Sequence, residues 1–140
     1  MNLIAIDAMG GDQAPSSVIE GTILATNSGV DCVLVGDQKR IEKLIKGRIS
    51  IPIHNYPEVI EMDEKPTRSI RRKKNASIIG CMNLLKNKEV RAVFSAGSTG
   101  AVMVSAITIL GKAKGISRPA IASVLPGHKQ DIVLLDSGAN

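Results

Sequence analysis

Short apolar runs alternate with helical patterns along this chain, and the alternation restricts the possible folds more than any other feature. Buried-strand patterns cover residues 3–8, 31–36 and 90–95, a weaker one covers 49–55, and helical patterns cover 14–27, 39–46, 67–87 and 101–110. Two more strands are expected at residues 119–125 and 132–136, around Pro126-Gly127. Strands that alternate with helices favour a mostly parallel sheet with helices on both faces. We therefore predict a single α/β domain over residues 1–140.

The amino-acid composition agrees with this fold and favours some classes of ligand over others. Hydrophobic residues make up 44% of the chain but aromatic residues only 1%, so aliphatic side chains must fill the core, as in buried parallel strands. The scarcity of aromatic side chains, with one Tyr and one Phe, argues against single-stranded nucleic acid as a ligand. A net charge of +5 suits an anionic partner, such as phosphate, an acidic protein or a lipid surface, although solubility alone explains it equally well.

Neither cysteines nor targeting signals indicate further chemistry. Cys32 and Cys81 lie in apolar patterns and are predicted to be small buried residues. No Cys or His has metal-ligand spacing, so we expect no metal site. The chain opens into a strand pattern instead of a signal peptide, and no apolar run is long enough to span a bilayer. We expect a soluble cytoplasmic protein.

Three strand ends carry glycines next to polar side chains. They are residues 7–12 (Asp-Ala-Met-Gly-Gly-Asp), 95–100 (Ser-Ala-Gly-Ser-Thr-Gly) and 136–140 (Asp-Ser-Gly-Ala-Asn). Glycine lets backbone N–H groups approach an anion, and a helix that starts behind the loop adds a favourable dipole. A tight turn that packs a helix on a strand is the simpler explanation for any one loop. Three such loops on one sheet edge predict an anion site.

The ligand predicted for this edge is a phosphate group. Neither the Walker pattern nor the dinucleotide pattern of glycines is present, which argues against a nucleotide held by a known motif. The hydroxyls of Ser95, Ser98 and Thr99 are able to donate to phosphate oxygens. The predicted phosphate contacts are Gly10, Gly11, Asp12, Ser95, Gly97, Ser98, Thr99 and Gly100. Cations that would supply charge are Arg68, Arg71, Lys73, Lys74 and Arg118, with a solvated helix face as the alternative for the first four.

Six stretches, in order along the whole chain, carry a resemblance to a known family. They are Ile4-Ala5-Ile6-Asp7-Ala8-Met9-Gly10-Gly11-Asp12 with Ala14-Pro15; Glu58-Val59-Ile60 with Met62 and Pro66; Arg71 with Lys73-Lys74; Ser95-Ala96-Gly97 with Thr99-Gly100-Ala101; Gly115-Ile116-Ser117-Arg118-Pro119-Ala120; and Leu134-Leu135-Asp136 with Gly138-Ala139-Asn140. In these stretches the chain resembles the PlsX family, the bacterial phosphate acyltransferases of phospholipid synthesis. It departs from the family at Ser98, where asparagine is usual, and at Ser137, where an apolar residue is more typical.

The resemblance implies a three-layer α/β/α fold, similar to those of phosphotransacetylases and isopropylmalate dehydrogenases. It implies an enzyme that converts acyl-ACP (acyl carrier protein) and inorganic phosphate to acyl phosphate and ACP, with no metal or organic cofactor. A homodimer that associates loosely with the membrane surface is also implied. Members of the family are more than twice as long, so we expect this chain to be the N-terminal part of a longer enzyme.

The implied reaction assigns roles to the candidate residues. Phosphate attacks a thioester carbonyl, so the protein must hold phosphate, orient it and stabilise the oxyanion. The glycine loops are expected to do this, with Asp136 and Asn140 orienting the reactants and the cations facing phosphate or the acidic carrier protein.

Two other functions stay open at this point. One is a phosphotransacetylase-like enzyme with a short acyl-CoA as donor, and the other is a non-catalytic fragment that binds phosphate without turnover. A nucleic-acid binder is disfavoured, because the chain has only one Tyr and one Phe and carries no recognised nucleic-acid motif.

Overall fold

The computed structural model describes residues 2–117 and 119–135. The chain divides into two compact units, which meet in sequence between Leu110 and Gly111 and are described separately below.

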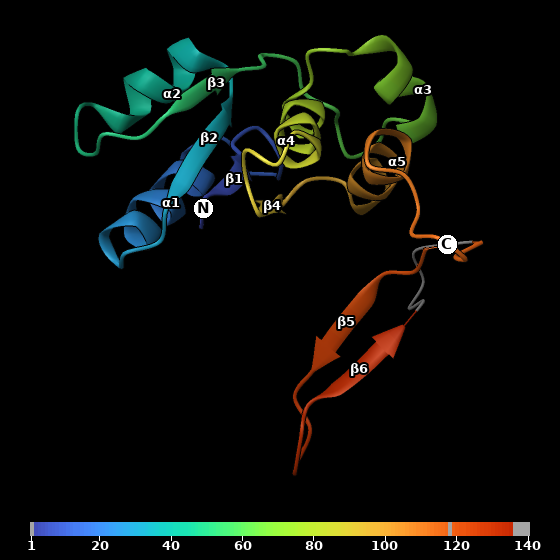
Figure 1. Ribbon diagram of the computed structural model, residues 1–140. Helices are drawn as coiled ribbons and strands as arrows, with labels where there is room; N and C mark the ends of the chain where they lie inside the picture. The colour runs from blue at the N-terminus through green and yellow to red at the C-terminus, as the bar shows by residue number, and fades with distance from the viewer. Residues whose placement is uncertain (1, 118, 136–140) are drawn as a thin grey trace. The chain divides into compact units, whose positions relative to one another are not determined.

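The unit up to Leu110 is built on a four-stranded parallel sheet (Figure 1). Its elements are β1 (Ile4–Asp7), α1 (Ser16–Asn27), β2 (Cys32–Gly36), α2 (Gln38–Ile45), β3 (Ile53–Asn55), α3 (Pro66–Arg72), α4 (Ser77–Lys86), β4 (Ala92–Phe94) and α5 (Thr99–Ile109). The strand order is β3-β2-β1-β4, and every neighbouring pair is parallel. The four strands predicted up to residue 95 thus occur in one sheet. β3 lies at an edge of the sheet and begins only after Pro52, so it is shorter than its sequence pattern.

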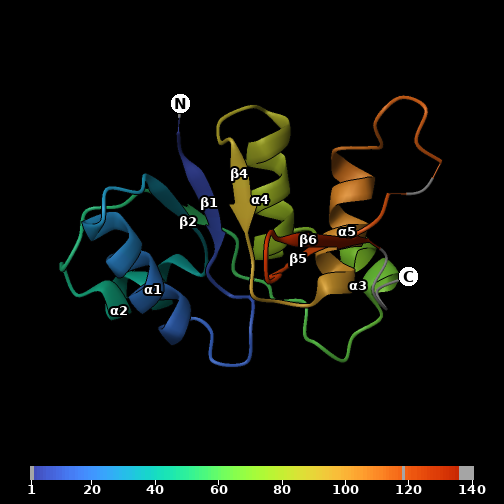
Figure 2. The same ribbon diagram turned by 90° about the horizontal axis from the view of Figure 1, so that it is seen from below.

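Helices cover both faces of this sheet, as predicted. Successive strand residues point to opposite faces, so Ile6 and Leu34 pack with α1 and α2, whereas Ala5 and Val33 pack with α4. Figure 2 shows α1 and α2 on one side of the sheet and α4 and α5 on the other. Leu34 is fully buried, which places the core on the central strands.

The single helix predicted over residues 67–87 is wrong, because the chain breaks between α3 and α4. The residues between the two helices form backbone hydrogen bonds with Glu58 instead. The N–H of Glu58 donates to the Asn75 carbonyl at 3.1 Å, and the N–H of Ser77 donates to the Glu58 carbonyl at 3.1 Å. The N–H of Asn75 also donates to the Glu58 carboxylate at 2.8 Å. These bonds replace helical ones, and a helical periodicity cannot register a partner 17 residues away.

The unit from Gly111 onward contains a hairpin of β5 (Ala122–Leu125) and β6 (Ile132–Leu135), which pair antiparallel in a separate two-stranded sheet. The third predicted glycine loop, residues 136–140, lies outside the described residues. The strand that precedes it, β6, belongs to the two-stranded sheet and not to the parallel one. The six residues 126–131 that join the strands are too few for a parallel crossover, which takes roughly a dozen.

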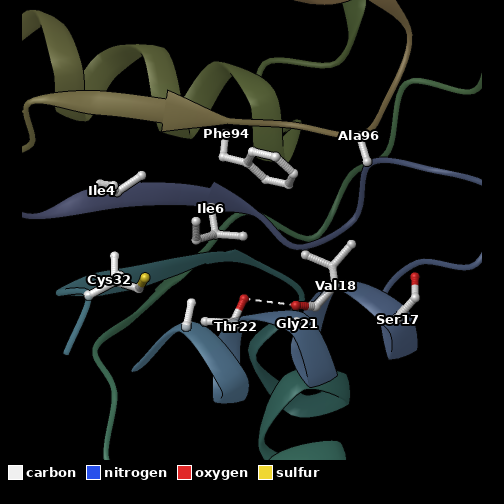
Figure 3. Close-up of a pocket in the computed structure, with 11 residues that line it drawn as sticks. Ile4, Ile6, Ser17, Val18, Gly21, Thr22, Cys32, Phe94 and Ala96 are labelled. Carbon is white, nitrogen blue, oxygen red and sulfur yellow. Dashed lines mark hydrogen bonds between the residues drawn. The ribbon is translucent and has the colours of Figure 1, made fainter. Parts of the chain in front are cut away.

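Helix α1 leaves part of the sheet uncovered. An apolar groove of about 420 Å³ lies beside it, lined by Ile4, Ile6, Ser17, Val18, Gly21, Thr22, Ala25, Val30, Cys32, Phe94 and Ala96. Figure 3 shows Phe94 of β4 beside Ile6, with the Thr22 hydroxyl donating to the Val18 carbonyl at 2.8 Å on the opposite wall. Phe94 is 55% exposed, so the helices of this face do not reach β4.

Among the residues that the structure describes, no helix has the length and apolar character needed to cross a membrane.

Candidate functional site

Two of the predicted glycine loops touch at the carboxyl ends of β1 and β4. A Cβ on Gly97 would lie 3.2 Å from the Gly10 Cα, and a Cβ on Gly11 would lie 3.1 Å from the Ala96 carbonyl oxygen. Gly11 also has φ of +115°, a conformation that favours glycine. The loops approach this closely because β1 and β4 are parallel neighbours, whose carboxyl ends lie at the same edge. Ligands bind at this edge in open α/β sheets.

A series of hydrogen bonds centred on Asp7 links the two loops. The Ser95 hydroxyl donates to Asp7 Oδ2 at 2.6 Å, and the N–H of Gly97 donates to Ser95 Oγ at 3.1 Å. The N–H of Met9 donates to Asp7 Oδ1 at 3.3 Å. Asp7 is only 3% exposed, whereas Ser95 is half-buried. The arrangement fixes the backbone of both loops around one buried carboxylate.

Helix α5 begins immediately after these hydrogen-bonded residues. Ser98 is its N-cap, and its hydroxyl oxygen accepts the N–H of Ala101 at 3.4 Å. Thr99 and Gly100 form the first turn, where backbone N–H groups lack helical partners and the dipole favours an anion. A Cβ on Gly100 would lie 3.0 Å from Pro66, so the start of α3 packs against the start of α5. The second loop therefore has the features of an anion-binding helix start.

The first loop also borders a second hollow. This hollow is lined by Met9, Gly11, Asp12, Ala14, Arg40, Val59, Ile60, Glu61, Met62 and Asp63. Gly10, in contrast, faces Asp7, Ser95 and Gly97. Asp12 thus lines this hollow, whereas Gly10 belongs to the cluster with Asp7 and Ser95; Gly11 lines the hollow and also packs against Ala96 of the second loop.

Four of the five predicted cations, Arg68, Arg71, Lys73 and Lys74, lie on α3 or directly after it. Arg68 and Lys73 line a hollow whose other walls are Glu58, Glu64, Lys65, Ser69 and Arg72. The Lys73 ammonium donates to the Glu64 carboxylate and, at 2.6 Å, to the Val59 carbonyl. Arg68, Arg71 and Lys74 are exposed. Lys73 therefore holds the 59–64 segment against α3, and the contact of the other three cations with an anion stays a prediction.

Acid is expected to loosen this Lys73–Glu64 contact. Hydrogen bonds from Lys73 and Ser69 lower the pKa of Glu64 from 4.5 to about 2. Because the folded-state pKa lies below the unfolded one, the contact contributes fully above pH 4.5 and is lost as the pH falls through about 2. Thermal unfolding of the chain across this range measures the loss. Glu64→Gln removes the titrating group, so an equal pH dependence in the variant and the parent would contradict the assignment.

The two cysteines are buried, as predicted. Burial, and to a smaller degree the Asp7 carboxylate, raise the pKa of the Cys81 thiol. Burial likewise raises the pKa of Cys32. Both thiols are protonated near neutral pH and are poor nucleophiles.

Three predicted residues, Arg118, Asp136 and Asn140, lie outside the described residues. The residue missing from the predicted contacts is Asp7. Its signal was present in the sequence, because a carboxylate closes an otherwise apolar strand immediately before a glycine loop. Arg40 lines the same hollow as Asp12 but had no such signal in the sequence, since it lies in the surface helix α2.

Comparison with known proteins gives one consistent result. The family model described as "Fatty acid synthesis protein" matches residues 3–140. The chain is 49% identical to a phosphate acyltransferase of Desulforamulus reducens, over 98% of this chain and 42% of that protein. It is 49% identical to that of Pelotomaculum thermopropionicum over 98% of the chain and 41% of the relative. The match to that of Anaeromyxobacter sp. is 44% identical, over 97% and 39%. The chain thus spans about two-fifths of the length of these curated relatives.

Proposed function

The chain belongs to the fatty acid synthesis protein family, and we propose that it supplies the phosphate-holding part of an enzyme that transfers an acyl group from acyl-ACP to inorganic phosphate. The observation that carries the proposal is the contact between the Gly10 and Gly97 loops beneath the start of α5. The names of the relatives support acyl transfer to phosphate, and the donor is our inference from the resemblance.

In the proposed reaction a phosphate oxygen attacks the thioester carbonyl carbon. The new bond joins carbon to the phosphate oxygen, the C–S bond breaks, and the proton of hydrogen phosphate leaves with the thiolate to give the thiol of ACP. No protein nucleophile is needed. The protein holds phosphate against the N–H groups of the Thr99 and Gly100 turn, which places the nucleophile and excludes unproductive orientations.

The exposed cations of α3 suit the acidic carrier protein. Arg68 and Arg71 lie on one short helix, and Lys74 follows its end. We place ACP against these side chains, with Arg118, and we assign orientation of the reactants to Asp136 and Asn140. A homodimer in the cytoplasm, with peripheral attachment to the membrane, completes the proposal.

The donor distinguishes the proposal from its alternative. The complete gene product is assayed for phosphate-dependent release of ACP from long-chain acyl-ACP, and for release of CoA from acetyl-CoA. We expect turnover with acyl-ACP that stops when phosphate is omitted. A strong preference for acetyl-CoA would establish the phosphotransacetylase-like alternative instead. Residues 1–140 alone are expected to be inactive, and phosphate-dependent turnover by this chain alone would exclude the reading of a non-catalytic fragment.

A further inference from the structure

Asp7 is a buried carboxylate at the candidate site, and neither ion pair found among the described residues involves it. An ionised carboxylate is costly to bury unless hydrogen bonds compensate. Its partners are the N–H of Met9 and the hydroxyl of Ser95, the second at 2.6 Å. Neither bond is part of the strand pairing of the sheet. The Asp7 carboxylate instead connects the first glycine loop, through Met9, to the second, through Ser95.

The hydrogen bonds of this cluster run in one direction. The Ser95 hydroxyl donates to Asp7 Oδ2, so its single hydrogen points at Asp7. Ser95 Oγ in turn accepts the N–H of Gly97 at 3.1 Å. A hydroxyl oxygen has two lone pairs and one hydrogen. The oxygen of the half-buried Ser95 therefore has one lone pair that these two bonds do not use, and no free hydrogen.

We propose that Asp7 is a positioning residue that makes Ser95 a hydrogen-bond acceptor for the P–OH group of hydrogen phosphate. The inference rests on the proposed function and specifies the protonation state in which phosphate binds. The unprotonated oxygens of phosphate then face donors, namely the first-turn N–H groups of α5 and the hydroxyl of Thr99. Ser95 contributes a lone pair here, in place of the donated hydrogen expected from the sequence.

Sulfate provides the contrast that tests this assignment. It resembles hydrogen phosphate in size and charge, but near neutral pH it carries no proton. A bound sulfate would turn an oxygen lone pair toward the lone pair of Ser95. The site therefore selects hydrogen phosphate over sulfate, and Asp7 is responsible for the selection although Ser95 separates it from the ligand.

Equilibrium dialysis of the complete gene product with radiolabelled phosphate and sulfate, near neutral pH, measures this selectivity. We expect the parent protein to prefer phosphate by about tenfold or more, the loss caused by one missing hydrogen bond to a charged group. In Asp7→Asn the amide is able to donate to Ser95, which frees the hydroxyl to donate to either anion. The preference should then fall about tenfold. Ser95→Ala removes the acceptor and should lower the preference similarly, whereas Ser95→Thr should retain it.

Asp37→Asn is the matched control. Asp37 caps α2 by accepting the N–H of Arg40 at 3.1 Å, and asparagine caps a helix equally well. This variant should keep the parent's selectivity. If the parent binds phosphate and both Asp7→Asn and Ser95→Ala keep the full preference, the role of Asp7 is overturned while the phosphate site stands. If the parent binds neither anion, the proposed function fails as well. Should Asp7→Asn fail to fold, Ser95→Ala decides.

Discussion

Gly10→Ala is expected to lower kcat/KM for phosphate-dependent acyl transfer by about a hundredfold. The added Cβ would lie 2.5 Å from Asp7 Oδ2, 2.9 Å from Ser95 Oγ and 3.0 Å from the Gly97 nitrogen. None of these atoms is the end of a flexible exposed side chain, so the two loops must move apart. A displacement of about 1 Å in a catalytic site costs about a hundredfold in rate. Steady-state kinetics of the complete gene product, with phosphate varied, measure the effect.

Two other glycines make this prediction specific. A Cβ on Gly97 would meet the Gly10 Cα at 3.2 Å and Ser95 Oγ at 3.3 Å, so Gly97→Ala should have a smaller effect. Gly21, in α1, has open space around its Cβ position, and Gly21→Ala should leave kcat/KM unchanged. Near-parental activity in Gly10→Ala would show that the contact between the loops is not needed for catalysis.

Gly80→Ala is expected to lower the free energy of unfolding by about 2 kcal/mol. Gly80 lies in α4, and its Cβ would stand 2.6 Å from the Tyr56 ring and 2.7 Å from Val35 Cγ1. Overpacking a core costs about 1–3 kcal/mol, and contacts this short place the cost at the upper end. The higher helix propensity of alanine offsets about 1 kcal/mol of this cost, which leaves a net loss of about 2 kcal/mol. Urea unfolding of the chain, followed by circular dichroism, gives the difference.

The same substitution in α1 should have the opposite sign. Gly21 is also inside a helix, but nothing lies within 4 Å of its Cβ position. Gly21→Ala should therefore raise the free energy of unfolding by about 0.5–1 kcal/mol. If Gly80→Ala proved as stable as Gly21→Ala, α4 would not pack on β2 and Tyr56 as closely as described.

The parallel sheet was predictable because its central strands are buried on both faces. Residues such as Val33 and Leu34 form a continuous apolar run, and a run of this kind bounded by turns indicates a buried strand. The order β3-β2-β1-β4 was not predictable in the same way. It depends on which strands pair, and the pairing of β1 with β4 joins segments about ninety residues apart along the chain.

The candidate site divides along the same line. Gly10, Gly97 and Ser98 were visible from local patterns, since glycine loops before a helix are written in consecutive residues. The bond between Asp7 and Ser95 was not visible, because it spans 88 positions. The break between α3 and α4 escaped for the same reason, as its cause is the distant Glu58 backbone. In both cases the partner lies far away along the sequence, where a local pattern cannot register it.

The β5–β6 hairpin has a consequence for the solubility of the chain. Its large apolar side chains stand exposed, among them Val124, Ile132 and Leu135. Within the described residues each strand of this ribbon has one partner, so both outer edges keep backbone groups able to pair with another strand. Residues 132–135 also carry no charge that would oppose intermolecular sheet growth. We therefore expect strand pairing between chains, when residues 1–140 are prepared alone, to begin at this hairpin.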